Sequence, residues 1–209
     1  MIAIVDYGMG NLRSVSKALE HLGAAVTVTS DPAVVARAEK LIVPGVGACP
    51  AAMRELMQRR LVEPIKQAIA SGKPYLGICL GLQLLFDRSE EGGGTDGLGV
   101  LKGTVKRFSF DRTPLKIPHM GWNEIRQKVK GKRQKECPLL EGVPDGSYFY
   151  FVHSYYADPI EREVVALESD YGQPFAAMVW KERLFATQFH PEKSQALGLR
   201  LLQNFMALG

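Results

Sequence analysis

The sequence predicts an α/β fold with an open, mixed and mainly parallel sheet flanked by helices, and with an antiparallel extension in the second half. Short aliphatic runs alternate with amphipathic segments in the first half, which is typical of a parallel sheet covered on both faces. After a glycine-rich stretch at 90–99, strand-like runs follow one another with short connections, which favours antiparallel pairing. No internal repeat or interdomain linker interrupts the 209 residues, so we expect a single domain over 1–209.

The individual elements follow from periodicity and from residues that start or stop helices. Asn11 is a suitable N-cap for the first helix, and Asp31 followed by Pro32 opens the second. We expect the third helix to break at Pro64, because proline cannot continue the helical hydrogen bonds. In the first half the expected strands are 2–6, 24–29, 40–45 and 73–78, and the expected helices are about 11–22, 31–39, 50–70 and 80–89. In the second half the expected strands are 100–108, 122–127, 147–152, 163–169, 174–181 and 184–190, before a C-terminal helix at about 195–206.

The composition is that of an ordinary globular protein, with 46% hydrophobic and 23% charged residues. The three cysteines, Cys49, Cys79 and Cys137, are not closely paired and match neither a disulfide framework nor a zinc-binding pattern. We therefore expect no metal site and no cofactor. The first residues lack a basic region and a long apolar region, and no apolar run approaches the ~18 residues of a membrane span. We expect a cytoplasmic protein.

The net charge of +4 comes from one segment of the chain. Residues 126–135 hold six lysines and arginines and no acid, and subtracting six charges leaves the rest of the chain at −2. No aromatic side chains alternate with the basic ones, as stacking on nucleic-acid bases would require. A solvated loop is therefore favoured over a nucleic-acid-binding arm.

A candidate nucleophile lies in "GICLG" at 77–81. The pentapeptide matches the nucleophile-elbow pattern with cysteine in place of serine, after an aliphatic strand and at the start of a helix. Such a turn strains the nucleophile, and Gly77 and Gly81 avoid the collision that larger side chains would make with each other. The N–H groups of the following helix would stabilise a Cys79 thiolate. A buried core cysteine is the alternative, and the pentapeptide alone does not decide between the two.

A thiolate also needs a proton acceptor, and His190 is the strongest candidate among four histidines. It ends an expected strand, and Glu192 lies two residues further on, so in an extended chain the two side chains share a face. The carboxylate could then orient the imidazole while its other nitrogen serves Cys79, as in a catalytic triad.

Oxyanion donors are expected from "PGVG" at 44–47, directly after the third strand. Its small residues would let backbone N–H groups approach a tetrahedral intermediate, although a tight turn uses the same residue types. The nucleophile, the histidine and this turn are all expected at the carboxyl ends of strands, where open α/β sheets bind ligands.

Six motifs together resemble the class I (triad) glutamine amidotransferases, and within them the glutaminase subunits of imidazole glycerol phosphate synthase. In order they are "DYGMGNLRSV" (6–15), "PGVG" (44–47), "GICLGLQLLF" (77–86), "HMGWN" (119–123), "YFYFVHSYY" (148–156) and "TQFHPEKS" (187–194). They extend over essentially the whole chain, and the basic segment is the main part that matches no family motif. The resemblance implies the class I glutamine amidotransferase fold.

The resemblance also implies a mechanism. Cys79 would attack the side-chain amide of L-glutamine to form a glutamyl thioester, His190 would move the proton, and Glu192 would hold His190. The implied oxyanion hole consists of the amides of Val46, Gly47 and Leu80. The implied substrate-binding residues are Gly47, Gln83, His153, Ser154 and Tyr155, with His153 a pocket residue rather than a second base.

The implied partner is a (β/α)8-barrel cyclase, bound as a heterodimer. It would receive the ammonia and form imidazole glycerol phosphate and aminoimidazole-carboxamide ribotide in histidine biosynthesis, and we expect the isolated glutaminase to be weakly active. The positions placed at this interface are Met120, Trp122, Asn123 and Lys193. Core packing is the alternative for Met120 and Trp122. We expect no nucleic-acid or membrane partner.

Four other functions compete with this one. The chain could be the amidotransferase component of anthranilate, guanylate or pyridoxal phosphate synthesis, although "DYGMGNLRSV" and "HMGWN" oppose that. It could be a cysteine peptidase or γ-glutamyl hydrolase of the same fold, which would act alone. A non-enzymatic interaction protein is disfavoured by the intact Cys79, His190 and Glu192. RNA binding through the basic segment is the weakest alternative.

Overall fold

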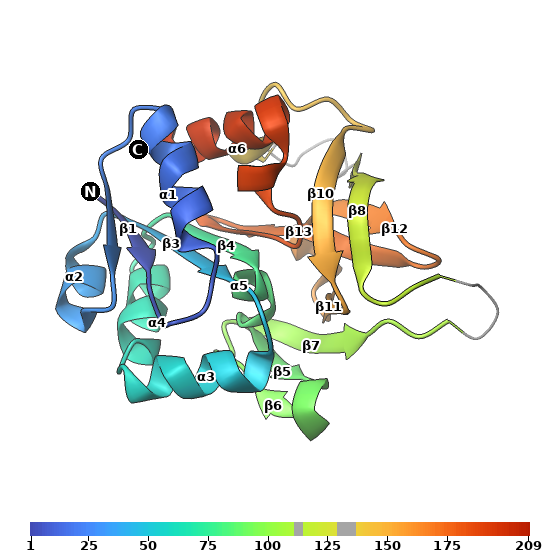
Figure 1. Cartoon of the computed structure of the whole chain (residues 1–209), viewed down its shortest axis with the longest axis horizontal. Helices are drawn as coiled ribbons and strands as arrows, with labels where there is room; N and C mark the ends of the chain where they lie inside the picture. The colour runs from blue at the N-terminus through green and yellow to red at the C-terminus, as the bar shows by residue number, and fades with distance from the viewer. Residues whose placement is uncertain (111–114, 129–136) are drawn as a thin grey trace.

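The computed structural model describes residues 1–110, 115–128 and 137–209, and its centre is an eight-stranded mixed sheet. The strands of this sheet are β1 (Ile2–Val5), β2 (Val26–Thr29), β3 (Lys40–Gly45), β4 (Tyr75–Cys79), β9 (Arg126–Gln127), β12 (Val165–Asp170), β13 (Pro174–Lys181) and β14 (Leu184–Thr187). Their order is β2-β1-β3-β4-β14-β13-β12-β9 (Figure 1). The pairings from β2 to β14 are parallel and those from β14 to β9 are antiparallel, which confirms the predicted fold class.

Two smaller sheets carry the rest of the second half. One pairs β8 (His119–Glu124) with β10 (Tyr148–His153), and the other has the order β11 (Tyr155–Pro159), β7 (Leu101–Arg107), β5 (Phe86–Ser89), β6 (Thr95–Asp96). The antiparallel strands of the second half are thus divided among the central sheet and these two smaller sheets. The chain bends at Ser154, so β10 and β11 join different sheets although only one residue separates them.

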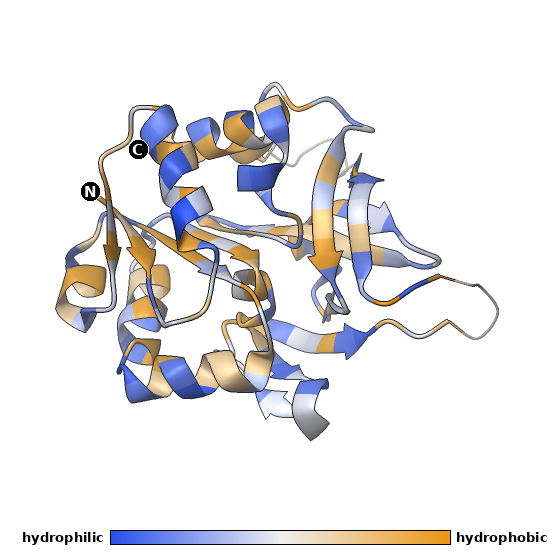
Figure 2. Cartoon of the chain, in the orientation of Figure 1, coloured by the Kyte–Doolittle hydropathy of each residue, from blue (hydrophilic) through white to orange (hydrophobic). Residues whose placement is uncertain are grey.

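Helices cover both faces of the parallel half. The helices are α1 (Leu12–His21), α2 (Pro32–Arg37), α3 (Cys49–Gln58), α4 (Val62–Ala70), α5 (Leu80–Gln83) and α6 (Gln195–Ala207), with short 3-10 turns η1 (Glu91–Gly93), η2 (Pro138–Leu140), η3 (Arg162–Val164) and η4 (Pro191–Lys193). Alternate residues of β1 face opposite ways: Ile2 and Ile4 share a core with α1 and α6, and Ala3 and Val5 share another with α2, α3 and α4. Figure 2 shows hydrophobic residues concentrated in these central strands.

Two of the helix predictions were wrong in detail. The break in the third expected helix lies between α3 and α4, at 59–61, and Pro64 sits within the first turn of α4. Proline is tolerated there because its missing N–H would have no intrahelical partner. The helix expected over 80–89 ends after one turn, because backbone N–H groups of Leu98 and Val100 bond to the carbonyls of Leu84 and Leu85. These tertiary hydrogen bonds replace those of a longer helix.

The predicted helix starts have different outcomes. The Asp31 side chain accepts a hydrogen bond from the Ala33 N–H at 2.8 Å, which confirms it as the cap of α2. Asn11 precedes α1 but makes no side-chain capping bond. Within the described ranges, no helix is long and apolar enough to cross a membrane.

The basic segment 126–135 lies mostly outside the described residues, so its predicted role as a solvated loop stays a prediction. Residues 126–128 of this segment belong to the described part. Arg126 pairs with Glu124 and Lys128 pairs with Glu168, each at 3.1 Å.

Candidate active site

Cys79 occupies a strained turn between β4 and α5. Its backbone angles are φ 55° and ψ −104°, which a residue with a side chain rarely adopts. A Cβ on Gly77 would lie 2.6 Å from the Gly81 carbonyl oxygen, and one on Gly81 would lie 1.8 Å from the Val43 oxygen. The predicted need for both glycines is confirmed, but the collisions they avoid are with backbone atoms. The turn projects Cys79 from the end of the strand.

The sheet brings the three predicted elements together. Strands β3, β4 and β14 are neighbours, with Gly45 paired to Cys79 and Thr187 paired to Ile78. Because all three strands run parallel, the "PGVG" turn, the cysteine and the segment with His190 leave the sheet at the same edge. The residue at the centre of this edge is Cys79.

His190 and Glu192 form a buried pair. Nδ1 of His190 lies 2.8 Å from Oε1 of Glu192, and the two side chains are 2% and 1% exposed. The prediction that they share a face of an extended strand was wrong, because β14 ends at Thr187 and His190 precedes the turn η4. The tight turn itself folds the carboxylate back onto the ring.

The surroundings of His190 favour its charged form. Burial acts to lower the pKa of the imidazole, but its interaction with the nearby Cys79 sulfur and its hydrogen bond and charge interaction with the Glu192 carboxylate raise the pKa to about 10. Since Nδ1 faces the carboxylate, Nε2 is the nitrogen left to exchange a proton. Nε2 has no partner in the described structure that meets the geometric limits of a hydrogen bond. The thiol therefore influences the ring without forming a full hydrogen bond to it.

A pocket of about 360 Å³ opens in front of Cys79 and could hold a molecule the size of an amino acid. It gathers every residue predicted for the oxyanion hole and for substrate binding. The lining residues are Val46, Gly47, Cys79, Leu80, Gln83, Glu91, Pro118, Val152, His153, Ser154 and Tyr155.

Glu91 is a lining residue that the sequence analysis missed. It lies in the turn η1 within the glycine-rich stretch, and its Oε2 accepts the backbone N–H of Cys49 at 2.7 Å. It is the acidic side chain among the described residues that line the pocket. A carboxylate at the start of a glycine-rich loop after the nucleophile helix was the available signal.

The backbone carbonyl of Tyr155 anchors a buried hydrogen-bond network. It accepts from Gln83 Nε2 at 2.9 Å and from His153 Nδ1 at 2.8 Å. His153 Nε2 lies 3.0 Å from Nδ1 of His119, and His119 Nε2 lies 3.2 Å from Nδ2 of Asn123. A carbonyl can only accept, so Nδ1 carries the proton on both neutral rings and each Nε2 accepts. His119 is a second member of the site region that the sequence analysis did not single out.

Both of these histidines are held neutral. Burial lowers the pKa of His119 to about 4. For His153, burial and, more weakly, the charges of His119 and His190 outweigh the bond to the Tyr155 carbonyl and lower the pKa to about 3. An imidazole that resists protonation is a poor general base, which supports His153 as a pocket residue.

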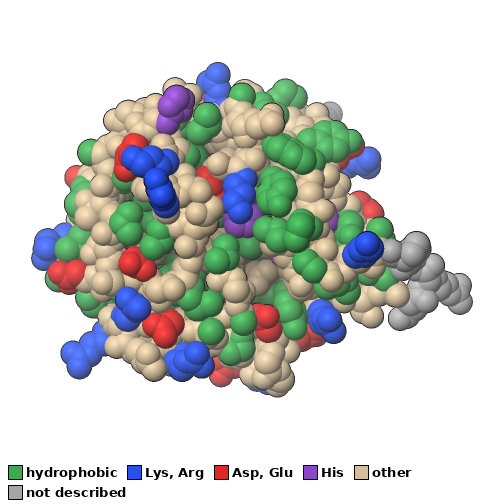
Figure 3. Space-filling model, in the orientation of Figure 1, with side chains coloured by type: hydrophobic (Ala, Val, Ile, Leu, Met, Phe, Trp, Pro, Cys, Tyr) green, Lys and Arg blue, Asp and Glu red, His purple; other side chains and the backbone are tan. Residues whose placement is uncertain are grey.

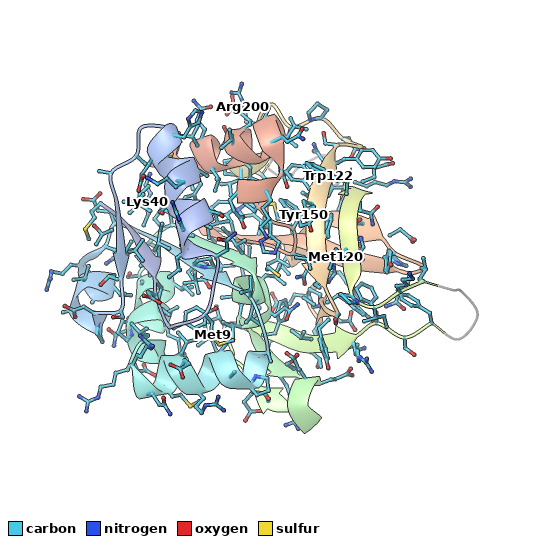
Figure 4. The ribbon with its side chains drawn as sticks, in the orientation of Figure 1. Met9, Lys40, Met120, Trp122, Tyr150 and Arg200 are labelled. Carbon is cyan, nitrogen blue, oxygen red and sulfur yellow. The ribbon has the colours of Figure 1, made fainter. Side chains whose placement is uncertain are left out.

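An apolar surface lies on β8 and β10, beside the pocket. Met120, Trp122 and Tyr148 are 63%, 46% and 55% exposed, and Figure 3 shows hydrophobic side chains gathered over these strands. The alternative that Met120 and Trp122 are core residues was therefore wrong. Figure 4 shows Met120, Trp122 and Tyr150 close together, and the Lys193 Nζ lies 5.7 Å from the Tyr150 ring centre.

Asn123 differs from the other residues predicted for the interface. Besides its contact with His119, its Nδ2 donates to the Asp170 carbonyl at 2.8 Å. Its side chain is thus used for contacts within the molecule.

No group of three or more His, Cys, Asp or Glu side chains in the described ranges is arranged to hold a metal ion.

Comparison with known proteins gives a consistent family. A model of the glutamine amidotransferase class-I family matches residues 3–208. The chain is 53% identical over 209 residues to the imidazole glycerol phosphate synthase subunit HisH of Syntrophotalea carbinolica, covering 98% of each chain. It is 54% identical over 205 residues to the HisH subunit of Rhodopirellula baltica, covering 98% of this chain and 96% of the relative.

Solved structures agree on the fold. A crystal structure described as a glutamine amidotransferase superimposes with a TM-score of 0.74 at 20% identity, covering 99% of this chain and 97% of the other. A structure of PurLQS from Thermotoga maritima gives 0.70 at 19% identity, covering 98% and 96%. At such identities these structures establish the fold alone.

Proposed function

The chain belongs to the class I glutamine amidotransferase family, and we propose that it is the glutaminase subunit of an imidazole glycerol phosphate synthase. Its reaction is the hydrolysis of L-glutamine to glutamate and ammonia. The observation that carries the proposal is the strained Cys79 beside the buried His190–Glu192 pair, at a pocket of amino-acid size. The full-length similarity to HisH subunits supports imidazole glycerol phosphate synthesis as the pathway that uses the ammonia, rather than anthranilate, guanylate or pyridoxal phosphate synthesis.

In the first half-reaction, the thiol proton of Cys79 passes to Nε2 of His190, and the sulfur attacks the side-chain amide carbon of glutamine. The Glu192 carboxylate stabilises the imidazolium that forms. Negative charge develops on the amide oxygen, where the backbone N–H groups of Val46, Gly47 and Leu80 act as the oxyanion hole.

The intermediate collapses when its carbon–nitrogen bond breaks. His190 returns its proton to the departing nitrogen, so that ammonia leaves and a glutamyl thioester remains on Cys79. His190 then takes a proton from water, whose oxygen attacks the thioester carbon. The carbon–sulfur bond breaks, glutamate leaves, and His190 returns its proton to the sulfur, which restores the thiol.

Substrate recognition follows from the donors and acceptors that remain available. Both N–H groups of the Gln83 amide are used, by the Tyr155 carbonyl at 2.9 Å and by Gln188 Oε1 at 3.1 Å. Gln83 therefore presents its Oε1 to the pocket and accepts an N–H of the substrate. The carboxylate of Glu91 balances the α-ammonium group of glutamine. Backbone groups of Gly47, His153, Ser154 and Tyr155 complete the contacts.

The partner is a (β/α)8-barrel cyclase, which uses the ammonia to form imidazole glycerol phosphate and aminoimidazole-carboxamide ribotide. The apolar surface of β8 and β10 is suited to such an interface because a covering subunit would remove Met120 and Trp122 from water. Lys193 follows the triad glutamate directly and lies at the same surface. Asn123 holds β8 in place beneath this surface through its hydrogen bond to the Asp170 carbonyl.

Glutamine hydrolysis by the full chain, with and without cyclase and its nucleotide ligand, tests the proposal. We expect weak activity alone and strong activation by the liganded cyclase, and a loss of at least about 10³-fold in Cys79→Ala. Equal activity of the lone chain and the complex would contradict partner dependence. Co-purification with a synthase of anthranilate, guanylate or pyridoxal phosphate formation, and not with a barrel cyclase, would favour that synthase as the enzyme that uses the ammonia.

Trp122→Ala tests the interface. We expect about 30-fold weaker binding of the cyclase, near 2 kcal/mol, because a central aromatic anchor is lost. Ile160→Ala is the matched control, since Ile160 is an exposed hydrophobic residue whose backbone N–H bonds to Lys102 of β7, in a different sheet from β8 and β10. Calorimetric titration measures both, and equal affinities of the two variants would remove Trp122 from the interface.

A further inference from the structure

Gln188 is a buried polar residue between β14 and His190 for which the proposed mechanism gives no task. Its backbone N–H donates to the Ala177 carbonyl at 2.8 Å, which continues the pairing of β14 with β13. Its side chain reaches the nucleophile, with Nε2 3.7 Å from Sγ of Cys79. Its Oε1 accepts from Gln83 at 3.1 Å.

We propose that Gln188 is a further catalytic residue, whose side-chain amide donates a hydrogen bond to the Cys79 sulfur and stabilises the thiolate that attacks the substrate. The inference rests on the proposed glutaminase function and adds to it a donor on the reacting atom. Through its other end, the same amide also holds Gln83 in the orientation that presents an acceptor to the pocket.

The Tyr155 carbonyl determines which end of each amide faces which way. Because this carbonyl only accepts, the atom of Gln83 that meets it must be the nitrogen. The same nitrogen then donates its second hydrogen to Gln188, so the atom of Gln188 that faces Gln83 must be the oxygen. The nitrogen of Gln188 is therefore the atom directed at Cys79 Sγ.

The other groups around the sulfur increase the value of such a donor. The Cys79 thiol donates to the Val152 carbonyl oxygen at 3.8 Å, and once the thiol is ionised this oxygen would repel the thiolate. The helix that follows Cys79 has only one turn, so its dipole is small. The N–H of the Gln188 amide offsets this repulsion of the thiolate by the carbonyl. Gln188 is fully buried, so water cannot replace it as the donor.

Two titratable side chains also act on Cys79. The sulfur interacts with the His190 imidazole without a full hydrogen bond to Nε2. For Tyr7, burial first and then charge interactions with Tyr75, Cys79 and Cys49 raise the pKa far above its usual range, so it stays neutral. The Tyr7 hydroxyl has no hydrogen-bond partner among the described residues. Gln188 therefore supplies the neutral hydrogen-bond donor on the sulfur in the described site.

The test is the pH dependence of Cys79 alkylation by iodoacetamide in the full chain, with the modified site identified by mass spectrometry. Gln188→Met keeps the size of the side chain and a weak sulfur acceptor for Gln83 but removes the donor. We expect the midpoint of the alkylation profile to move to higher pH by about one unit, a tenfold smaller reactive fraction at neutral pH, equivalent to about 1.4 kcal/mol. An unchanged midpoint would overturn the proposal.

A second variant and a control separate this effect from folding. Gln188→Glu keeps the acceptor for Gln83 and the side-chain shape, and its ionised carboxylate offers the sulfur no donor, so the midpoint should move at least as far. Thr187→Val removes the neighbouring buried bond from Thr187 to the Phe189 carbonyl, which is 2.9 Å long, and should leave the midpoint unchanged. A shift in this control equal to that of the glutamate variant would contradict a specific role.

The alkylation needs neither glutamine nor cyclase, so its outcome is independent of the proposed pathway. Glutamine turnover by the wild-type complex decides the proposed function. In the same complex, the methionine variant should lower kcat about tenfold, because the donor acts on the nucleophile. A wild-type complex without glutaminase activity would reject the function, whereas an active complex with an unaffected variant would reject Gln188 alone.

Discussion

Two buried histidine sites adjoin the pocket, one behind Cys79 and one that includes His153 of the pocket wall, and they respond to pH in opposite ways. After β14, interactions with Cys79 and Glu192 overcome burial and raise the pKa of His190 to about 10. On β8 and β10, burial lowers the pKa of His119 to about 4 and, with a weaker effect of neighbouring charges, that of His153 to about 3. The comparison shows that burial alone does not determine the state of an imidazole, because the charge of its partners decides.

The chemistry of the partners explains the two roles. His190 faces groups that carry or can take negative charge, so it can accept a proton and keep it through a reaction. His119 and His153 face each other, the Tyr155 carbonyl and the Asn123 amide, and a proton on either Nε2 would oppose another N–H. The first site is suited to proton transfer and the second to holding the pocket wall in position.

Among the variants that test this difference between the two sites, Glu192→Gln should have the largest effect. A neutral amide cannot stabilise the imidazolium, so the pKa of His190 should fall and kcat/KM for glutamine should drop about 10³-fold or more. Activity is measured in the cyclase complex with its ligand, across a range of pH. A variant with wild-type kcat/KM would show that the carboxylate does not set the state of His190.

The two sites should have opposite effects on the free energy of unfolding as a function of pH, one on the acid limb of the curve and one on its alkaline limb. His119 and His153 have lowered pKa values, so their contribution to the free energy of unfolding is complete above pH 6.5. This contribution is lost as the pH falls below 6.5, by roughly 1.4 kcal/mol for each histidine and pH unit, because the unfolded chain then binds the protons more readily. His190 has a raised pKa, so its contribution is complete below pH 6.5 and is lost as pH rises toward 10. Urea unfolding from pH 4.5 to 9 measures both limbs.

Variants assign each limb to its site. His119→Gln removes one titrating ring and should flatten the acid limb, with the alkaline limb unchanged. Glu192→Gln should flatten the alkaline limb alone. If both variants changed the same limb, the assignment of opposite behaviour to the two sites would be wrong.

Ser194→Ala should have the smallest effect, because it acts on the contact between the two regions. The Ser194 hydroxyl donates to the His190 carbonyl at 2.6 Å and accepts the Tyr150 N–H at 3.0 Å, so it joins η4 to β10. Removing it leaves both backbone groups without this partner and should lower the free energy of unfolding by about 1 to 3 kcal/mol. Thermal unfolding with Ser71→Ala as the control checks this, since Ser71 makes a hydroxyl bond at a distant helix end.

The sequence predicted best what depends on neighbouring residues. The strained turn at Cys79 follows from "GICLG", since the glycines that permit it are two residues away on either side. The start of α2 follows from Asp31 and Pro32 in the same way. The prediction for α5 failed because distant backbone groups at 98–100 end the helix, and no local pattern records them.

Glu91, His119 and Gln188 were missed for a related reason. Each is an ordinary polar residue in its own segment and acquires a role from a partner that is remote in sequence. Gln188 lies 109 positions from Cys79, and His119 lies 34 positions from His153. His119 and Gln188 are buried, so these contacts are important, because an unpaired polar group away from water is costly.

The sequence by itself determined most of the elements of the parallel half, the strained nucleophile turn and the family to which the chain belongs, since these depend on residues close together or on motifs in a set order. Only the tertiary structure decided that β14 lies beside β4 and that the two histidine sites differ. It also decided that the Tyr155 carbonyl orients both amides at the nucleophile. Hydrogen-bond polarity and pKa depend on which distant groups share a low-dielectric interior, and that is set only when the chain has folded.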